Sequence, residues 1–244
     1  MNKPDTAIIL AAGLGSRLEA VFPGKPKGLL EIGGMSLVGR SLNILKTSGI
    51  ERFLIGTGYR DRYYEPLAKQ FDAVCVFNGK FSETGSMYTL WNMRHCIGGA
   101  FLLLESDLLY HPSAIDILLD DERADVILAS GPTHSGDEVF IECSNDGLLI
   151  NMSKYRSVIS KTDTELVGIS KISTGLFRLM CDAFEQSSED NPKFDYEEAL
   201  VAASKRSPIY VKKSEALVWC EIDDPSHLKR ATGVIWPLIR KDCR

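Results

Sequence analysis

The chain has 244 residues, of which 44% are hydrophobic and 25% are charged, and its formal net charge is -5. These ordinary globular values exclude a disordered, collagen-like or coiled-coil chain. A nucleic-acid-binding protein normally carries a basic excess, so the acidic balance argues against nucleic acid as a partner.

The first half of the chain alternates short apolar runs with helical patterns. We expect strands over 7–12, 52–58, 73–78, 100–106 and 124–130, and helices over 36–48, 61–70, 85–95 and 112–119. Several of these runs are apolar at consecutive positions, which is typical of strands buried on both faces of a parallel sheet. The order predicts a Rossmann-like α/β fold: a mostly parallel open sheet with helices on both faces, binding ligands at the carboxyl ends of its strands.

After residue 130 the pattern changes, because three strands follow without helices between them. These strands are expected over 138–143, 147–153 and 166–173, and Asn145-Asp146-Gly147 is a good turn between the first two. Helices over 175–187, 194–205 and 225–240 and strands over 208–213 and 217–222 complete the chain. We interpret residues 1–244 as a single domain with an elaborated, β-containing second half.

The cysteines and the N-terminal segment indicate a cytoplasmic protein. No cysteines are spaced as CxxC, so a zinc site is not expected. The apolar run 7–12 is too short for a signal peptide, and no run approaches the roughly 20 apolar residues of a membrane span. We therefore expect no membrane partner. The sequence leaves the oligomeric state open, with a homodimer as one candidate.

The first strand runs into a glycine loop, Gly13-Leu14-Gly15-Ser16-Arg17. Small residues let backbone amides approach a phosphate, Ser16 adds a hydroxyl, and a helix starting here would add its positive end. A tight strand–helix turn is the alternative. A dinucleotide fingerprint would need glycine in place of Leu18, and a Walker A loop would need Gly-Lys-Ser/Thr, so neither matches.

Two lysines, Lys25 and Lys27, flank Pro26 shortly after the glycine loop. Proline excludes a helix interior here, so the lysines lie in a loop. A solvated loop would need no function, but together with the glycine loop this segment predicts a cradle for a triphosphate.

The motifs LAAGLGSRL (10–18) and PKGLLEIGG (26–34), at this spacing, resemble the nucleotidyltransferase superfamily of the sugar-phosphate pyrophosphorylase type. The resemblance covers essentially the whole chain. It implies that a nucleoside triphosphate is joined to a phosphorylated small molecule with release of pyrophosphate. The segments 77–91, 102–110 and 219–228 are most similar to the cytidylyltransferases that use CTP and small aminoalcohol phosphates or phosphonates.

The resemblance also implies that residues of about 1–130 bind the nucleotide. Residues of about 131–244 would bind the acceptor and supply the last metal ligand. Catalysis would fall to Arg17, Lys27, Asp107 and Asp223, the two aspartates holding Mg²⁺. The nucleotide would contact Leu10, Ala11, Ala12, Gly13, Gly15, Ser16, Arg17, Lys27, Thr84, Gly85, Ser86, Ser106 and Asp107.

The positions of the two aspartates in the sequence also predict a metal site, independently of the resemblance. Asp107 and Asp223 each follow an apolar strand, where carboxylates delivered by two strand ends could share a hard cation. An aspartate at such a place can instead cap the next helix. We expect Asp223 or Asp224, before Pro225, to do so, and the sequence leaves open which of them is the ligand. Glu105 and Glu221 are further candidates.

The acceptor half is rich in charged side chains and lacks a tryptophan at the place where choline-phosphate relatives carry one. Carboxylates suit a primary ammonium better than a quaternary one. The acceptor would contact Asp137, Glu138, Lys154, Arg156, Asp195 and Glu197, with the two cations on its phosphonate. The alternative is that these are surface charges.

The segments 135–142, 151–157 and 166–173 are most similar to the aminoethylphosphonate group. We therefore expect 2-aminoethylphosphonate first and phosphoethanolamine second. Phosphocholine and a sugar 1-phosphate remain alternatives, as does a non-catalytic nucleotide sensor. A nicotinamide-dependent oxidoreductase would need an acid after the second strand, which ends instead in Gly56-Thr57-Gly58-Tyr59-Arg60.

Overall fold

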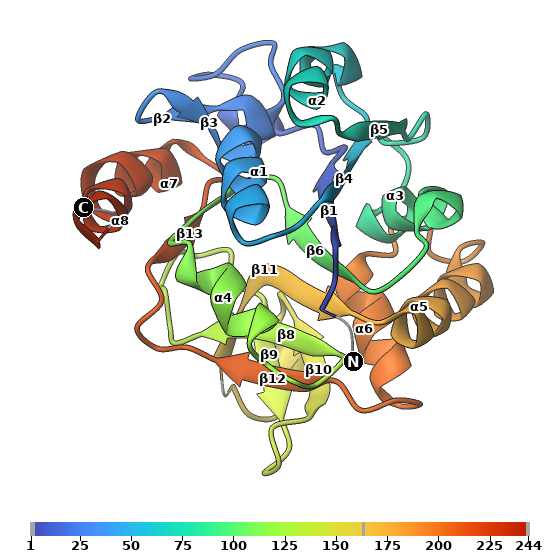
Figure 1. Ribbon diagram of the computed structural model, residues 1–244. Helices are drawn as coiled ribbons and strands as arrows, with labels where there is room; N and C mark the ends of the chain where they lie inside the picture. The colour runs from blue at the N-terminus through green and yellow to red at the C-terminus, as the bar shows by residue number, and fades with distance from the viewer. Residues whose placement is uncertain (1–2, 163, 243–244) are drawn as a thin grey trace.

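The structure is a computed structural model that describes residues 3–162 and 164–242, and a large mixed sheet lies at its centre (Figure 1). In these residues nine strands form the sheet in the order β10-β9-β11-β6-β1-β4-β5, with β8 beside β11 and β12 beside β8. The strands are β1 (Thr6–Ala11), β4 (Arg52–Thr57), β5 (Val74–Phe77), β6 (Phe101–Glu105), β8 (Val126–Ser130), β9 (Phe140–Cys143), β10 (Leu149–Ser153), β11 (Thr164–Ile172) and β12 (Tyr210–Lys213).

The sheet has a parallel part and an antiparallel part. Strand β1 runs parallel to β4 and β6, and β4 runs parallel to β5. Strand β11 pairs antiparallel with β6, β8 and β9. The first half of the chain therefore builds the parallel α/β layer that its pattern predicts, and the second half extends the same sheet.

Helices cover both faces of the sheet. Helices α1 (Leu37–Thr47), α2 (Glu65–Phe71) and α4 (Ser113–Leu119) pack on one face, and α3 (Ser86–Asn92), α5 (Thr174–Ser187) and α6 (Tyr196–Ser204) pack on the other. Neighbouring residues of β1 fill different cores, since Ala7 and Ile9 face the first group and Ile8 faces the second. The consecutive apolar residues of the strand thus have the two-sided burial that the sequence predicts.

A third, smaller core packs the C-terminal helices against two short strands that the sequence did not reveal, β2 (Glu31–Ile32) and β7 (Leu108–Tyr110). A further short strand, β3 (Met35–Ser36), pairs antiparallel with β2. Strand β7 pairs antiparallel with β13 (Trp219–Glu221), and the backbone N–H of Ile222 donates to the carbonyl of Asp107 at 3.0 Å. This pairing brings the ends of two distant segments to one point.

Some predicted helices differ in detail. The segment predicted as one helix over 225–240 is α7 (Pro225–Arg230), a π-helical stretch (Ala231–Ile235) and α8 (Trp236–Asp242). The segment predicted over 61–70 opens with a 3-10 turn (Asp61–Tyr64), because proline is placed in the first turn of α2. Helix α3 ends at Asn92, before a 3-10 turn (Arg94–Cys96).

Two other expectations can be compared with the structure. The turn at Asn145-Asp146-Gly147 is confirmed, since Gly147 has a φ of 75° and its N–H donates to the carbonyl of Ser144. No helix in the described ranges has the length and apolar character needed to cross a membrane. Cys75, Cys96, Cys181 and Cys220 are free thiols, and Cys243 lies outside the described residues.

Candidate active site

A cavity of about 360 Å³ opens at the carboxyl ends of β1 and β6, where the fold class predicts a ligand. The beginnings of α3 and α6 and the end of β13 complete its wall. Most predicted site residues line it: Leu10, Ala11, Ala12, Gly13, Gly15, Arg17, Lys27, Thr84, Gly85, Ser86, Ser106, Asp107, Lys154, Asp195, Glu197 and Asp223. The structure thus gathers residues from both halves of the chain around one space.

Four predicted residues do not line this cavity: Ser16, Asp137, Glu138 and Arg156. Ser16 begins a single 3-10 turn (Ser16–Leu18), so the helix expected after the glycine loop is absent there. Asp137 and Glu138 border a smaller neighbouring cavity, and Glu138 accepts a local hydrogen bond from the N–H of Gly136. Arg156 is exposed, with its guanidinium 5.6 Å from the ring centre of Phe140. The placement of Glu138 and Arg156 therefore gives no support to acceptor roles.

The glycine loop packs directly against the lysine segment. Gly15 has a φ of 61°, and a Cβ placed on it would lie 3.1 Å from the Cβ of Lys27. Both the backbone conformation and the close approach favour glycine at this position. The glycine loop and Lys27 thus lie side by side at the edge of one cavity, and the triphosphate cradle stays a prediction.

Lys27 lies between the two predicted metal ligands. Its ammonium forms ion pairs with the carboxylates of Asp107 and Asp223, and all three side chains are largely buried. Burial alone lowers the pKa of Lys27, but the two carboxylates outweigh it and raise the pKa well above the ordinary lysine value. Lys27 is therefore a fixed positive charge at this end of the cavity, which we name the phosphate end (Arg17, Lys27, Asp107 and Asp223).

The structure distinguishes Asp223 from Asp224. The Oδ1 atom of Asp224 accepts hydrogen bonds from the N–H groups of Ser226 at 2.7 Å and His227 at 2.9 Å, which makes it the N-cap of α7. The hydroxyl of Ser226 also donates to this oxygen at 2.7 Å, and this bond, followed by the bond from the N–H of His227, lowers the pKa of Asp224. Asp223 instead faces the cavity. One of the two aspartates caps the helix, as the sequence predicted, and it is Asp224.

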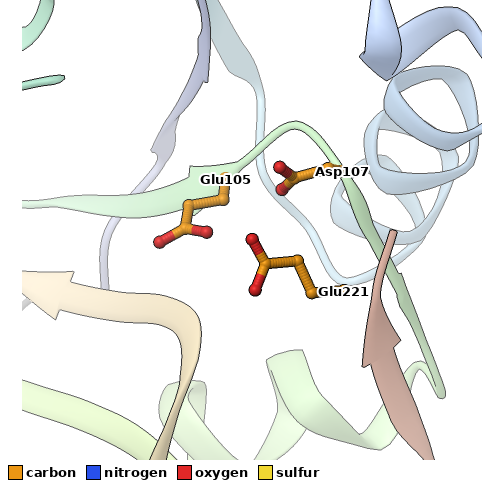
Figure 2. A group of neighbouring side chains, drawn as sticks. All are labelled: Glu105, Asp107 and Glu221. Atoms are coloured by element: carbon orange, nitrogen blue, oxygen red, sulfur yellow. The ribbon is translucent and has the colours of Figure 1, made fainter. Parts of the chain in front are cut away.

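Among the residues that the structure describes, the carboxylates form two groups that could hold a metal ion. In the first, ligand atoms of Glu105, Asp107 and Glu221 lie within 4.8 Å of one another, and Figure 2 shows the three side chains converging from different segments. The second consists of Asp137, Glu221 and Asp223. Glu221, which the sequence offered as an alternative ligand, belongs to both groups. Burial, then the charge of Asp107, raises the pKa of Glu221.

Two buried oxygens at this place have no hydrogen-bond partner within the residues that the structure describes. They are Oδ1 of Asp107 and Oδ2 of Asp223. A buried carboxylate oxygen without a partner is costly, and hard divalent cations prefer such oxygen ligands. The residues present therefore fit a divalent cation.

A further group of charged and polar side chains lines the same cavity, and we name it the acceptor end (Glu105, Lys154, Tyr196 and Glu197). Its Glu105 also belongs to the first carboxylate group. The hydroxyl of Tyr196 donates to Glu105. Gly168 lies beside this carboxylate in an irregular stretch of β11, has a φ of 80°, and would place a Cβ 3.0 Å from the Glu105 carboxyl carbon. A glycine in β11 thus makes room for Glu105, whose pKa is raised by burial and by the charge of Asp107.

Glu197 and Lys154 both line the cavity, and they form no ion pair with each other in the described part of the chain. Oε2 of Glu197 is buried and has no hydrogen-bond partner among these residues, and burial raises its pKa, with a contribution from Glu105. Desolvation lowers the pKa of Lys154, but the carboxylates of Glu197 and Glu221 outweigh this effect, so the pKa is raised above the ordinary lysine value. Glu197 therefore contributes a buried carboxylate oxygen without a partner to a cavity that Lys154 also lines.

Asp195 lines the cavity, but its carboxylate joins two helices. Oδ1 accepts from the N–H of Ser86 at 2.8 Å and from its hydroxyl at 2.9 Å, and the same side chain forms a capping box with Glu198 at the start of α6. The sequence assigned Ser86 to the nucleotide and Asp195 to the acceptor. The structure shows that they bind each other, so Asp195 is better described as a residue that holds α3 and α6 together.

Some cavity residues were not found from the sequence: Gly28, Tyr64, Phe81, Thr89, Lys193 and Tyr196. A Cβ on Gly28 would lie 2.8 Å from the hydroxyl of Tyr64. The lack of a side chain at Gly28 therefore allows the chain to pack closely against Tyr64 beneath the site. Tyr196 could have been found from the sequence, because it directly precedes Glu197 in the acidic segment at the start of α6. Tyr64 is almost fully buried, and such a residue cannot be told from ordinary core in a sequence.

Comparison with known families gives the identity of this arrangement. The family model of the MobA-like NTP transferase domain matches residues 7–157, which include the glycine loop, Lys27, Asp107 and Lys154. The chain belongs to this family. The expected resemblance to nucleotidyltransferases is thereby confirmed.

Curated relatives include several cytidylyltransferases. The chain is 28% identical over 240 residues to a bifunctional IPC transferase and DIPP synthase of Thermococcus kodakarensis, covering 95% of this chain and 51% of that protein. It is 40% identical over 83 residues to a choline-phosphate cytidylyltransferase of Haemophilus influenzae, covering 34% of this chain and 36% of that protein. A 2-aminoethylphosphonate cytidylyltransferase of Lancefieldella rimae is 28% identical over 196 residues, covering 78% and 77%. The chain thus aligns with about half or less of the first two proteins.

Solved structures share the fold. The inositol-1-phosphate CTP transferase from T. maritima superposes with a TM-score of 0.83 at 22% identity, covering 98% of both chains. The CTP:phosphocholine cytidylyltransferase from Streptococcus pneumoniae gives 0.80 at 19% identity, covering 94% of this chain and 98% of the other. At these identities the likeness establishes the α/β fold.

Proposed function

We propose that this protein is a cytidylyltransferase that joins CTP to a small amine-bearing phosphonate, 2-aminoethylphosphonate, and releases pyrophosphate. The observation that carries the proposal is the position of Lys27, which is fixed between Asp107 and Asp223 beneath the glycine loop and faces the same cavity as the carboxylate-rich acceptor end. The cytidylyltransferases among the relatives support CTP as the nucleotide.

In the proposed complex, residues 10–13 and 84–86 hold the cytosine and ribose, and the amides of the glycine loop face the phosphates. A phosphonate oxygen of the acceptor forms a bond to the α-phosphorus of CTP. The bond from that phosphorus to the bridging oxygen breaks, and pyrophosphate leaves with the electron pair. Lys27 and Arg17 offset the negative charge that would otherwise repel the incoming anion. No general base is needed, because the attacking oxygen is already anionic near neutral pH.

The metal in this proposal is Mg²⁺, held by Asp107 and Asp223 with Glu221 beside both. Their unpartnered oxygens and buried position support this assignment. When bound there, Mg²⁺ supplies further neutralisation of the triphosphate charge.

The acceptor end supports an acceptor with a primary amine. A primary ammonium donates three hydrogen bonds, and Glu105 and Glu197 offer carboxylate oxygens to it. Lys154 supplies a positive charge for the phosphonate. Tyr196 is the aromatic residue beside these carboxylates, but its hydroxyl is engaged by Glu105, and no tryptophan lines the cavity among the described residues. A quaternary ammonium would lack the cage of aromatic faces that favours it.

An acceptor panel tests the proposal. Purified protein is incubated with CTP, Mg²⁺ and one of 2-aminoethylphosphonate, phosphoethanolamine, phosphocholine or glucose 1-phosphate, and pyrophosphate release is measured. We expect the two primary amines to be the best acceptors, with the phosphonate first, and chelation of the metal to abolish turnover. A large preference for phosphocholine or the sugar phosphate would overturn the acceptor assignment. An absence of turnover with every acceptor would overturn the proposed reaction class.

A further inference from the structure

His227 is buried beside the phosphate end but does not line the main cavity. It lies in the first turn of α7 and is 5% exposed. Its Nδ1 atom accepts from the backbone N–H of Asp223 at 3.3 Å, and its Nε2 atom lies 3.0 Å from the carbonyl of Ser135. A backbone N–H can only donate and a carbonyl can only accept, so the hydrogen of the ring belongs on Nε2. The imidazole thus links the end of β13 to the loop of residues 131–139.

The same loop reaches Arg17 through Asp137. The guanidinium of Arg17 contacts Oδ2 of Asp137 at 2.7 Å and Oδ1 of Asp223 at 3.1 Å. The contacts therefore close a ring that runs from Asp223 to His227, Ser135, Asp137 and Arg17 and back to Asp223. We name it the Arg17 ring. It joins three segments that are far apart in the sequence.

The loop has anchors on both sides of this ring. The N–H of Thr133 donates to the buried carboxylate of Glu165 at 2.8 Å, and the carbonyl of Val139 accepts from the N–H of Leu166 at 2.9 Å. Between them, Gly136 has a φ of 92°, a conformation that favours glycine. His227 contacts the loop between these anchors, one residue before this glycine. Its hydrogen bond is therefore placed to fix the direction in which Asp137 points.

We propose that His227 is a positioning residue that holds Asp137 in place and thereby preorganises Arg17 for the triphosphate. Arg17 is a long side chain whose relative exposure is 54%, so without partners it would sample many rotamers. Restricting it before the nucleotide arrives reduces the entropy lost on binding. The inference rests on the proposed function, because it takes the phosphate end as the place of the triphosphate.

Nucleotide binding measured by calorimetry, with CTP and Mg²⁺ and no acceptor, tests the inference. We expect His227→Ala to weaken CTP binding by about threefold to tenfold, the range for releasing one or two restrained side chains. Asp137→Ala should weaken it similarly. The double variant should bind no more weakly than the worse single one, because both changes break the same ring. His227→Gln, which can still donate to Ser135, should recover most of the affinity, whereas His227→Asn, which is too short, should not.

His111 is the matched control. It also lies at the start of a helix, where its Nδ1 atom contacts the hydroxyl of Ser113 at 2.8 Å, and it is not part of the Arg17 ring. His111→Ala should leave CTP binding unchanged. Thermal unfolding of every variant is measured alongside, so that loss of folded protein is separated from loss of affinity.

Three results would overturn the inference: unchanged or tighter CTP binding by His227→Ala, tighter binding by Asp137→Ala, or losses that add in the double variant. Tighter binding would mean that Asp137 competes with the nucleotide for Arg17. Failure of the proposed function shows up elsewhere, as an inactive wild-type protein in the acceptor panel. Turnover in that panel, together with CTP binding unaffected by His227→Ala, would reject the inference and leave the proposed function in place.

Discussion

The charged side chains at the two ends of the cavity are paired in different ways. At the phosphate end, Lys27 and Arg17 are paired with Asp107 and Asp223, so each cation already has carboxylate partners. At the acceptor end, Glu197 keeps a buried oxygen without a partner among the described residues, and the positive charge of Lys154 acts on it without forming an ion pair. At the first end the cations are paired before a ligand arrives, and the unpartnered oxygens of Asp107 and Asp223 suit a metal ion, whereas at the second end the unpartnered oxygen of Glu197 suits a cationic ligand.

The two ends are also built from different kinds of structural element. The phosphate end is built from strand ends and loops fixed by the pairing of β7 with β13 and by the contact of Gly15 with Lys27. The acceptor end depends on the first turn of α6, on a loop after β10 and on an irregular stretch of β11. The first end is therefore held by strand pairing and loop packing, and the second by the start of a helix, a loop and an irregular strand.

The largest effect is expected at the phosphate end. Replacing Asp107 with Asn removes one of the two charges around Lys27 and one ligand of the proposed metal, so turnover should fall on the order of 10²- to 10³-fold. Asp116→Asn, an exposed change on α4, is the control and should retain full activity. Pyrophosphate release measures both variants, and near-normal turnover of Asp107→Asn would remove this residue from the catalytic set.

A smaller, acceptor-specific effect is expected at the other end. Glu197→Gln removes the negative charge proposed to bind the amine, so the KM for 2-aminoethylphosphonate should rise about tenfold or more, the usual worth of a hydrogen bond to a charged group. The KM for CTP should stay the same. Ethylphosphonate, which has no amine, should be used equally by both proteins, and an equal loss with this analogue would show that Glu197 does not recognise the amine.

The glycine beside Glu105 gives a test of stability. Gly168→Ala places a methyl group against the Glu105 carboxylate at a backbone φ of 80°. We expect the free energy of unfolding to fall by about 1–3 kcal/mol, because both the close contact and the conformation are unfavourable. Urea unfolding measures the change. Combining Gly168→Ala with Glu105→Ala should recover part of the loss, and no recovery would mean that backbone strain alone is responsible.

The smallest effect is expected outside the cavity, at the cap of α7. Asp224→Ala should lower the free energy of unfolding by about 1 kcal/mol, since it removes the side chain that caps the first turn. Activity at a temperature where the protein stays folded should be nearly unchanged. A loss of activity comparable with that of Asp107→Asn would reverse the assignment of Asp223 and Asp224.

The sequence by itself determined the α/β class, the strands of the large sheet and most of the residues that line the cavity. These features are local, because burial on two faces leaves consecutive apolar residues, and a phosphate loop needs small residues followed by cations. Gly13, Gly15, Lys27 and Asp107 could be identified for this reason.

Tertiary structure alone decided how the charges pair. The three-residue strand β7 is too short for a periodic signal, yet its pairing with β13 sets Asp107 beside Asp223. The sequence pattern predicts different ligands for Ser86 and Asp195, but the packing of α3 against α6 brings them together, and the hydroxyl of Ser86 donates to the carboxylate of Asp195. A carboxylate looks the same in a sequence whether it caps a helix, pairs with a lysine or faces an empty cavity, because that difference depends on neighbours brought near by the fold.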